Sequence, residues 1–144
     1  MELIKKFQAF AHRNDVKELM AAARAGDVEK LNLLKKRHAD LNALDSVLFE
    51  NALMKAAACG RTSFVQALVD AKVDLNSVSA FGLSALDMAE IYKRQGCITV
   101  LEDAGAKNSP MRDMLKRYAK EDKQERTPNP QGGTSSVAKL RLYF

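Results

Sequence analysis

The 144-residue sequence has no tryptophan, only three prolines and two cysteines, and no long apolar run. Without about 18 consecutive apolar residues it contains no candidate transmembrane helix, and residues 1–10 lack the features of a secretory signal. Cys59 and Cys97 lie far apart and form no CxxC pair, which fits reduced intracellular thiols better than a disulfide framework. We therefore expect a cytoplasmic protein, with a nuclear one as the alternative.

Groups suited to catalysis are scarce. His12 and His38 are the two histidines, and neither has a Cys, Asp or Glu at the spacing of a metal site. The sequence also lacks GxSxG, HExxH and a glycine-rich phosphate loop. It therefore predicts a protein that is not an enzyme, with no catalytic residue, cofactor or metal, and argues against a small-molecule ligand.

The net charge of +5 is unevenly distributed. Residues 1–43 carry about +3 and residues 110–144 about +4, whereas residues 44–109 carry about −2. A nucleic-acid-binding domain is expected to gather Lys and Arg on one face of its folded unit, often with stacking aromatics. The mildly acidic middle argues against nucleic acid as the main partner.

An internal repeat organises the middle of the chain. The segment LMAAARAG at residues 19–26 recurs as LMKAAACG at residues 53–60 and, more weakly, as LDMAEIYK at residues 86–93. An apolar pair follows each copy at a matched distance: Leu31 and Leu34, Val65 and Leu68, Ile98 and Leu101. Small residues at the same positions of each copy allow neighbouring helices to approach closely, while Leu19, Leu53 and Leu86 fill the layer between them.

These segments resemble the ankyrin repeat, a unit of about 33 residues with a β-turn and two antiparallel helices. The resemblance covers residues 12–109, as repeats over about 12–45, 46–78 and 79–109, and implies an all-α solenoid. The family's TPLH tetrad appears as KELM, NALM and SALD, so its usual hydrogen-bond network is expected to be lost or reduced. Lys93 replaces the glycine that ends the inner helix, so the third inner helix is expected to run on or to close in a different turn.

Both ends of a repeat stack need caps, and the sequence offers two. Residues 1–11 carry an apolar stripe at helical spacing and are expected to form an N-terminal capping helix. Residues 110–126 begin with Pro110 after a Ser109 N-cap and are expected to form a C-terminal capping helix. Residues 127–144 are expected to be a flexible tail with an apolar end.

The family resemblance implies a protein partner on the concave face, which hairpin tips and exposed edges of inner helices form. Carried over by position, the partner-binding residues are Arg13, Asn14, Arg24, Val47, Leu48, Glu50, Phe81, Leu83, Ile91 and Tyr92. Apolar groups at tips are unusual and suggest contacts. Two arrangements stay open around Phe49, which replaces the turn glycine in a loop one residue longer: Leu48 and Phe49 are surface contacts, or they fold inward.

The function expected from these patterns is a protein-binding adaptor, inhibitor or scaffold. The alternatives are a constitutive subunit of a larger complex, and a binder of nucleic acid or anionic membrane through the basic ends, at Lys5, Lys6, Lys116, Arg117 and Lys120. The tail residues Leu142, Tyr143 and Phe144 resemble an apolar C-terminal ligand of PDZ domains, or fold back onto the repeats.

Overall fold

The structure is a computed structural model of the chain, and it describes residues 1–124. Two units are distinguished, residues 1–109 and residues from Pro110 onward. The described residues contain helices and no strand: α1 (Glu2–Ala25), α2 (Val28–Lys36), α3 (Ala52–Cys59), α4 (Thr62–Asp70), α5 (Ala85–Ile91), α6 (Gln95–Asp103) and α7 (Pro110–Gln124). The expected all-α solenoid of helix-turn-helix units is confirmed.

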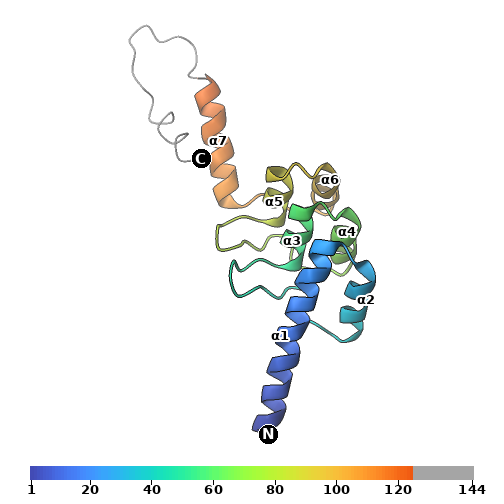
Figure 1. Ribbon diagram of the computed structural model, residues 1–144. Helices are drawn as coiled ribbons and strands as arrows, with labels where there is room; N and C mark the ends of the chain where they lie inside the picture. The colour runs from blue at the N-terminus through green and yellow to red at the C-terminus, as the bar shows by residue number, and fades with distance from the viewer. Residues whose placement is uncertain (125–144) are drawn as a thin grey trace. The chain divides into compact units, whose positions relative to one another are not determined.

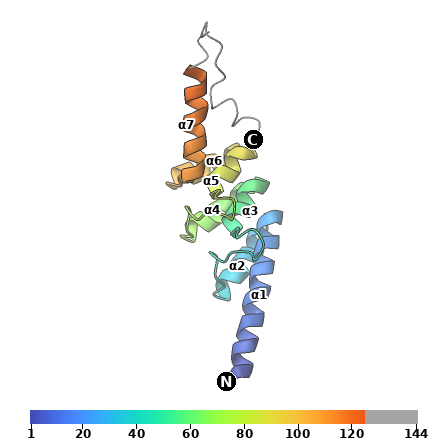
Figure 2. The same cartoon turned by 90° about the vertical axis from the view of Figure 1, so that its left-hand side faces the viewer.

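Residues 1–109 stack three helix pairs in two layers (Figure 1). The inner helices α1, α3 and α5 lie side by side with α3 in the middle, and the outer helices α2, α4 and α6 pack behind them. Two hairpin loops, one before α3 and one before α5, project from the inner layer on the side away from the outer helices. Figure 2 shows the same succession of pairs from the side.

The core runs continuously between the two layers. Most of its large side chains come at matched positions of the pairs, and all are fully or almost fully buried: Leu19, Leu31, Leu34, Leu53, Phe64, Val65, Leu68, Leu86 and Leu101. Ala23, Ala57 and Ala89 have no exposed surface, because they lie where adjacent inner helices meet. Small side chains at this seam let the backbones approach, so burial of the leucines on either side is shared by consecutive repeats.

The three inner helices end in the same left-handed turn. Gly26 has φ of 74° and Gly60 of 73°, and Lys93 adopts φ of 57° at the matching position. The backbone N–H of Arg94 donates to Ala89 O at 2.8 Å, as the corresponding N–H groups do in the other two pairs. The expectation that α5 runs on or closes differently is therefore wrong, because this hydrogen bond holds the turn without glycine.

Gly96 does not replace the missing glycine of this turn. It lies inside α6, where a Cβ would come within 2.7 Å of Thr62 Oγ1 on α4. Its lack of a side chain therefore serves the close approach of two outer helices rather than a helix end.

Asparagine side chains connect successive repeats. Asn42 Oδ1 accepts a hydrogen bond from the backbone N–H of Asp74 at 2.8 Å, one repeat further on. Asn76 Oδ1 accepts in the same way from Lys107 N at 3.0 Å. Each bond joins the loop after one outer helix to the loop after the next, so the loops of the three repeats are held at a fixed spacing.

The third repeat has a hydrogen-bond network of its own, although the family's network was expected to be lost or reduced. Ser84 caps α5, with its Oγ accepting from Asp87 N while the Asp87 carboxylate accepts from Ser84 N. The fully buried Asp87 also accepts from the Asn108 amide at 2.7 Å and from the Ser109 N–H at 3.2 Å. The loss or reduction expected from the changed TPLH tetrad is therefore not seen in this repeat, because a serine and an aspartate replace the usual pair.

The first helix differs from the expectation. Residues 2–25 form one helix, whereas a separate capping helix was expected to end at residue 11 and a hairpin to follow. No glycine or proline precedes Gly26, so no residue interrupts the helix. Asp15 and Glu18 form ion pairs with Arg37 after α2, which attach the middle of the helix to the first repeat. The residues expected to cap the stack are exposed in its first half.

The second unit is described up to Gln124 as the single helix α7. Its apolar side chains recur at helical spacing, and Met111, Met114 and Tyr118 are exposed. Residues 125 and 126 of the expected helix, and the whole expected tail with Leu142, Tyr143 and Phe144, lie outside the described residues.

Candidate functional site

Two adjacent hairpins form the centre of the candidate surface. In the first, Asp45 N donates to Glu50 O at 2.9 Å; in the second, Ser79 N donates to Leu83 O at 2.9 Å. The first loop is therefore one residue longer, as the sequence indicated. Ala80 N donates to the carbonyl oxygen of Leu48 at 2.8 Å, so one hairpin is hydrogen-bonded directly to the next.

The tips of both hairpins expose apolar side chains. Val47 is 77% exposed and Phe81 57%, and Phe49 and Val78 are also exposed. Hairpin tips are usually polar, because an apolar side chain there gains nothing from the protein's own core. Several such groups on two hydrogen-bonded hairpins form an apolar patch that the fold itself does not need, which is typical of a contact surface.

Phe49 takes a strained backbone conformation to present its ring. Its φ is 51°, in the left-handed region, where the second hairpin has Gly82 with φ of 71°. A bulky side chain is uncommon in this region. The ring is exposed, so the alternative in which Phe49 folds inward is wrong, whereas Leu48 is half-buried and offers mainly its carbonyl group to the second hairpin.

An ion cluster fixes the first hairpin to α3. Lys55 Nζ lies 3.3 Å from Asp45 Oδ2 and also pairs with the carboxylate of Glu50, and the Lys55 side chain is only 14% exposed. The other oxygen of Asp45 accepts from the N–H groups of Leu48 at 2.8 Å and of Val47 at 3.3 Å. The longer loop is therefore held by a carboxylate at its base and by a cation from the inner helix.

The same contacts set the protonation of this cluster. Partial burial opposes the charged form of Asp45, but hydrogen bonds from the Leu48 N–H and from Lys55 outweigh it and lower the pKa of Asp45 below 3.8. Burial likewise opposes the charged form of Lys55, and the two carboxylates outweigh it and raise the pKa of Lys55 above 10.5. Asp45 and Lys55 are therefore charged at neutral pH, and the contact with Lys55 engages Glu50 within the protein.

The ends of the inner helices hold the next group of expected residues. Ile91 and Tyr92 are exposed at the end of α5, and Arg24 is exposed at the end of α1. The carbonyl of Arg24 accepts a hydrogen bond from Arg61 Nε at 2.9 Å. These residues lie at the opposite end of the inner helices from the hairpins, so the expected set divides into a hairpin group and a helix-end group.

Three expected residues have other surroundings. Arg13 and Asn14 were assigned to the concave face of the first repeat; they lie within α1, where the Asn14 amide donates to Glu18 at 2.9 Å. Leu83 is half-buried and packs against the core. The structure therefore brings Val47, Leu48 and Phe81 together on the hairpins and leaves the first repeat without one.

Sequence reasoning missed two features of this surface. Val78 is exposed beside the second hairpin and was not named. The Lys55 cluster was also missed, although acidic residues at both ends of a loop and a lysine within the following helix turn are a readable signal of an ion pair.

Other chemical groups of the described residues are few. Within residues 1–124, no three His, Cys, Asp or Glu side chains gather in a way that could hold a metal ion. Cys59 is a free exposed thiol; Cys97 is free and buried, and burial raises its pKa. None of the helices in this part of the chain is both long and apolar enough to cross a membrane.

Comparison with known proteins gives one positive result. The family model for ankyrin repeats matches residues 19–111, in three copies. These bounds include the three helix pairs from the second half of α1 to the start of α7. No curated protein matches the sequence.

Proposed function

The chain belongs to the ankyrin-repeat family, whose repeats generally mediate protein–protein interaction, and from this premise we propose that it binds a protein partner through its two hairpins. The ends of the inner helices, at Arg24, Ile91 and Tyr92, extend the same binding surface. The protein acts in this way as an adaptor, inhibitor or scaffold.

The observation that carries the proposal is the exposure of Val47, Phe49 and Phe81 on neighbouring hairpins. Complete burial of one such side chain contributes about 1.5–3 kcal/mol relative to leaving it in water. A partner that covers these three side chains therefore gains enough to offset a large part of the cost of association. Tyr92 adds a large side chain with a polar hydroxyl, a type enriched at the centres of interfaces.

The hairpins are also held in place before any partner arrives. The bond between Ala80 N and Leu48 O joins them, and the Lys55 ion cluster fixes the first hairpin to α3. A surface that is already ordered loses less conformational entropy on binding than a mobile loop. This rigidity supports a role for the hairpins in recognition.

The test is quantitative affinity capture from a cell extract with the complete chain. We expect a specific partner to be captured by the wild type and lost with Phe81→Glu/Val47→Glu, because charges would be buried unpaired at the centre of the interface. The matched control is Leu33→Glu on α2, a residue that is also exposed but lies in the outer layer. Thermal melting of each variant establishes that the fold is retained.

Two further variants assign the surface. Tyr92→Glu tests the helix-end group alone, and a chain ending at residue 126 tests the tail with Leu142, Tyr143 and Phe144. A partner retained by Phe81→Glu/Val47→Glu but lost on truncation would contradict the proposal and move the function to the tail. Equal loss with Leu33→Glu would show that the capture is not specific to the hairpin surface.

A further inference from the structure

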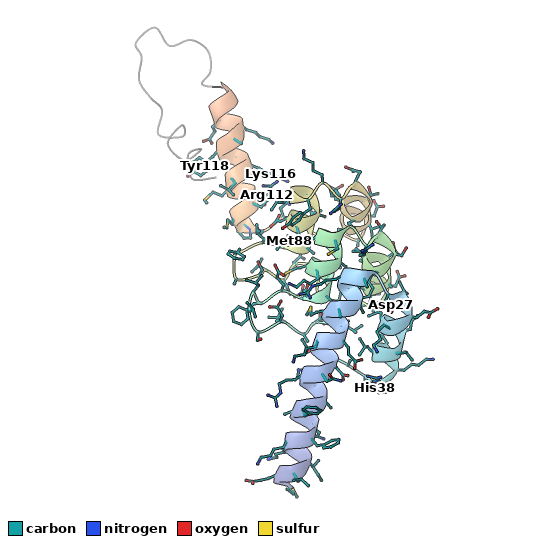
Figure 3. All side chains as sticks on the ribbon, viewed as in Figure 1. Asp27, His38, Met88, Arg112, Lys116 and Tyr118 are labelled. Carbon is teal, nitrogen blue, oxygen red and sulfur yellow. The ribbon has the colours of Figure 1, made fainter. Side chains whose placement is uncertain are left out.

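The first half of α1 contacts little of the rest of residues 1–109. Every residue from 1 to 14 is exposed, although residues 2–14 are helical. Figures 1 and 2 both show this part of α1 extending beyond the other helices of the repeats. In Figure 3, Asp27 and His38 lie just before and just after α2, and the side chains of the first half of α1 extend away from the neighbouring helices. We call residues 2–17 the arm.

The arm has one apolar face. Leu3, Ile4, Phe7 and Phe10 recur at helical spacing and cover an arc of roughly 120° at 100° per residue. Leu3 is 81% exposed and Phe7 76%, and the other two are exposed by more than half. Two aromatic and two aliphatic side chains thus form an apolar stripe that nothing in residues 1–109 covers.

Positive charge accompanies the stripe. Lys6, Arg13 and Lys17 lie along one edge of it by helical spacing, and Phe10 shares a shallow hollow with Arg13, Asn14 and Lys17. Lys5 lies on the opposite side of the helix. None of these four cations forms an ion pair within the described part of the chain.

The acidic residues nearby do not neutralise this charge. Glu18 forms an ion pair with Lys30 at 3.2 Å and lies equally close to Arg37, which also approaches Asp15 at 3.6 Å. Hydrogen bonding and attraction from Lys30 outweigh partial desolvation and lower the pKa of Glu18, which keeps it charged and engaged with α2. Glu2 is the remaining acid of the arm and lies near Lys6 by helical spacing, so the edge of the stripe carries three cations against one carboxylate.

Three kinds of occupant fit an apolar stripe on a helix. A second copy packed antiparallel would bring the same edge of cations against Lys6 and Arg13, and these like charges would repel. An acidic helix of another protein would have to match both the apolar stripe and its charged edge in register. A lipid surface needs no register, and it accommodates a basic helix with Phe and Leu on one face.

We propose that the arm binds flat on an anionic lipid bilayer, with Leu3, Ile4, Phe7 and Phe10 in the interface and Lys6, Arg13 and Lys17 beside the lipid head groups. The arm is already helical because it continues a helix anchored in the repeats, so binding needs no coil-to-helix transition. One short apolar face gives weak, reversible attachment. The repeats then present their hairpin surface at the membrane.

The test is cosedimentation of the complete chain with phosphatidylcholine vesicles, with and without phosphatidylserine. We expect binding to the vesicles that contain phosphatidylserine, weakened by salt, and much less binding to phosphatidylcholine alone. Phe7→Ser/Phe10→Ser should reduce binding at least about tenfold, since it removes most of the apolar face. Lys6→Glu/Lys17→Glu should reduce it at least about 25-fold, at roughly fivefold for each of the two cations lost near the surface.

The matched control is Val47→Ser/Phe81→Ser, which removes as many exposed apolar side chains from the hairpins. It should bind vesicles like the wild type, so this test is independent of the hairpin proposal. Absence of binding to phosphatidylserine vesicles, or equal loss in the control, would overturn the inference. A wild type that is dimeric by light scattering and becomes monomeric with Phe7→Ser/Phe10→Ser would overturn it in favour of a second copy.

Discussion

The second and third repeats build the same backbone with different residues. In the second, Gly60 ends the inner helix and Phe49 occupies the strained position of the hairpin; in the third, Lys93 ends the helix and Gly82 occupies the hairpin position. Each repeat thus has glycine at one of the two left-handed positions and a larger residue at the other.

The polar contacts differ in a complementary way. The second repeat fixes its longer hairpin with the Lys55 cluster and caps α3 with the side chain of Asn51 alone. The third has a short hairpin without an ion pair and instead buries Asp87 among backbone and amide donors. Different residues therefore stabilise the same backbone in the two repeats. Packing against neighbouring repeats imposes the backbone conformation, and the local residues need only supply contacts that stabilise it.

The largest effect is expected from giving the third repeat the apolar residue of the second. Asp87→Met copies Met54, which occupies the matching position, but removes the buried carboxylate that accepts hydrogen bonds from Ser84, Asn108 and Ser109. Each such loss carries a desolvation penalty, so we expect the free energy of unfolding to fall by about 2–4 kcal/mol. Urea denaturation measures it.

Asp87→Asn is the control for that substitution. It keeps an oxygen acceptor at the same place and should cost less than half as much. Equal stability of Asp87→Met and the wild type would show that the buried network contributes nothing to the third repeat.

A smaller effect is expected from replacing Lys55 of α3 by the residue at the matching position of α5. Lys55→Met copies Met88 of the third repeat and leaves the carboxylates of Asp45 and Glu50 close together without their cation. Removing one member of a partly buried ion cluster should lower stability by about 1–3 kcal/mol. The triple variant Asp45→Ser/Glu50→Leu/Lys55→Met copies the third repeat at these three positions and should recover most of this loss.

The acid side of the stability curve provides a second measurement on the same cluster. Because the pKa of Asp45 is lowered in the folded protein, its stabilising effect is present above pH 3.8 and is lost as the pH falls through the lowered value. Urea denaturation at several pH values from neutral down to the lowered pKa of Asp45 measures this effect. The free energy of unfolding should fall less for the triple variant than for the wild type. If Lys55→Met alone already matched the wild type at neutral pH, the ion cluster would not be what holds the hairpin.

The sequence predicted the repeated parts well because they depend on local and periodic signals. Leu19, Leu53 and Leu86, with the alanines that follow them, suffice to place three inner helices. The turn at Lys93 was not predicted, because a left-handed helix end is expected to need glycine, whereas the hydrogen bond from Arg94 N to Ala89 O holds Lys93 in this conformation.

The surface was harder to predict than the fold. The position of Val47 and Phe81 follows from the repeat spacing, whereas Arg13 and Asn14 lie within α1, which replaces the hairpin that the family pattern calls for. The stripe of the arm was recognised, but its expected use as a cap depended on tertiary contacts that the sequence does not contain. Local periodicity shows that a face is apolar, not what covers it.

The smallest effect should come from restoring glycine where the two repeats differ at the end of the inner helix. Lys93→Gly relieves a left-handed conformation that costs an ordinary residue about 1–2 kcal/mol, but it also adds freedom to the unfolded chain. We expect a net gain of about 0.5–1 kcal/mol in the free energy of unfolding, measured by urea denaturation. The reverse exchange, Gly60→Lys, should cost more than this gain, because a Cβ there would lie 2.9 Å from Arg94 Cδ. If Lys93→Gly instead destabilised the protein, the Lys93 side chain would contribute more to the third repeat than its backbone conformation costs.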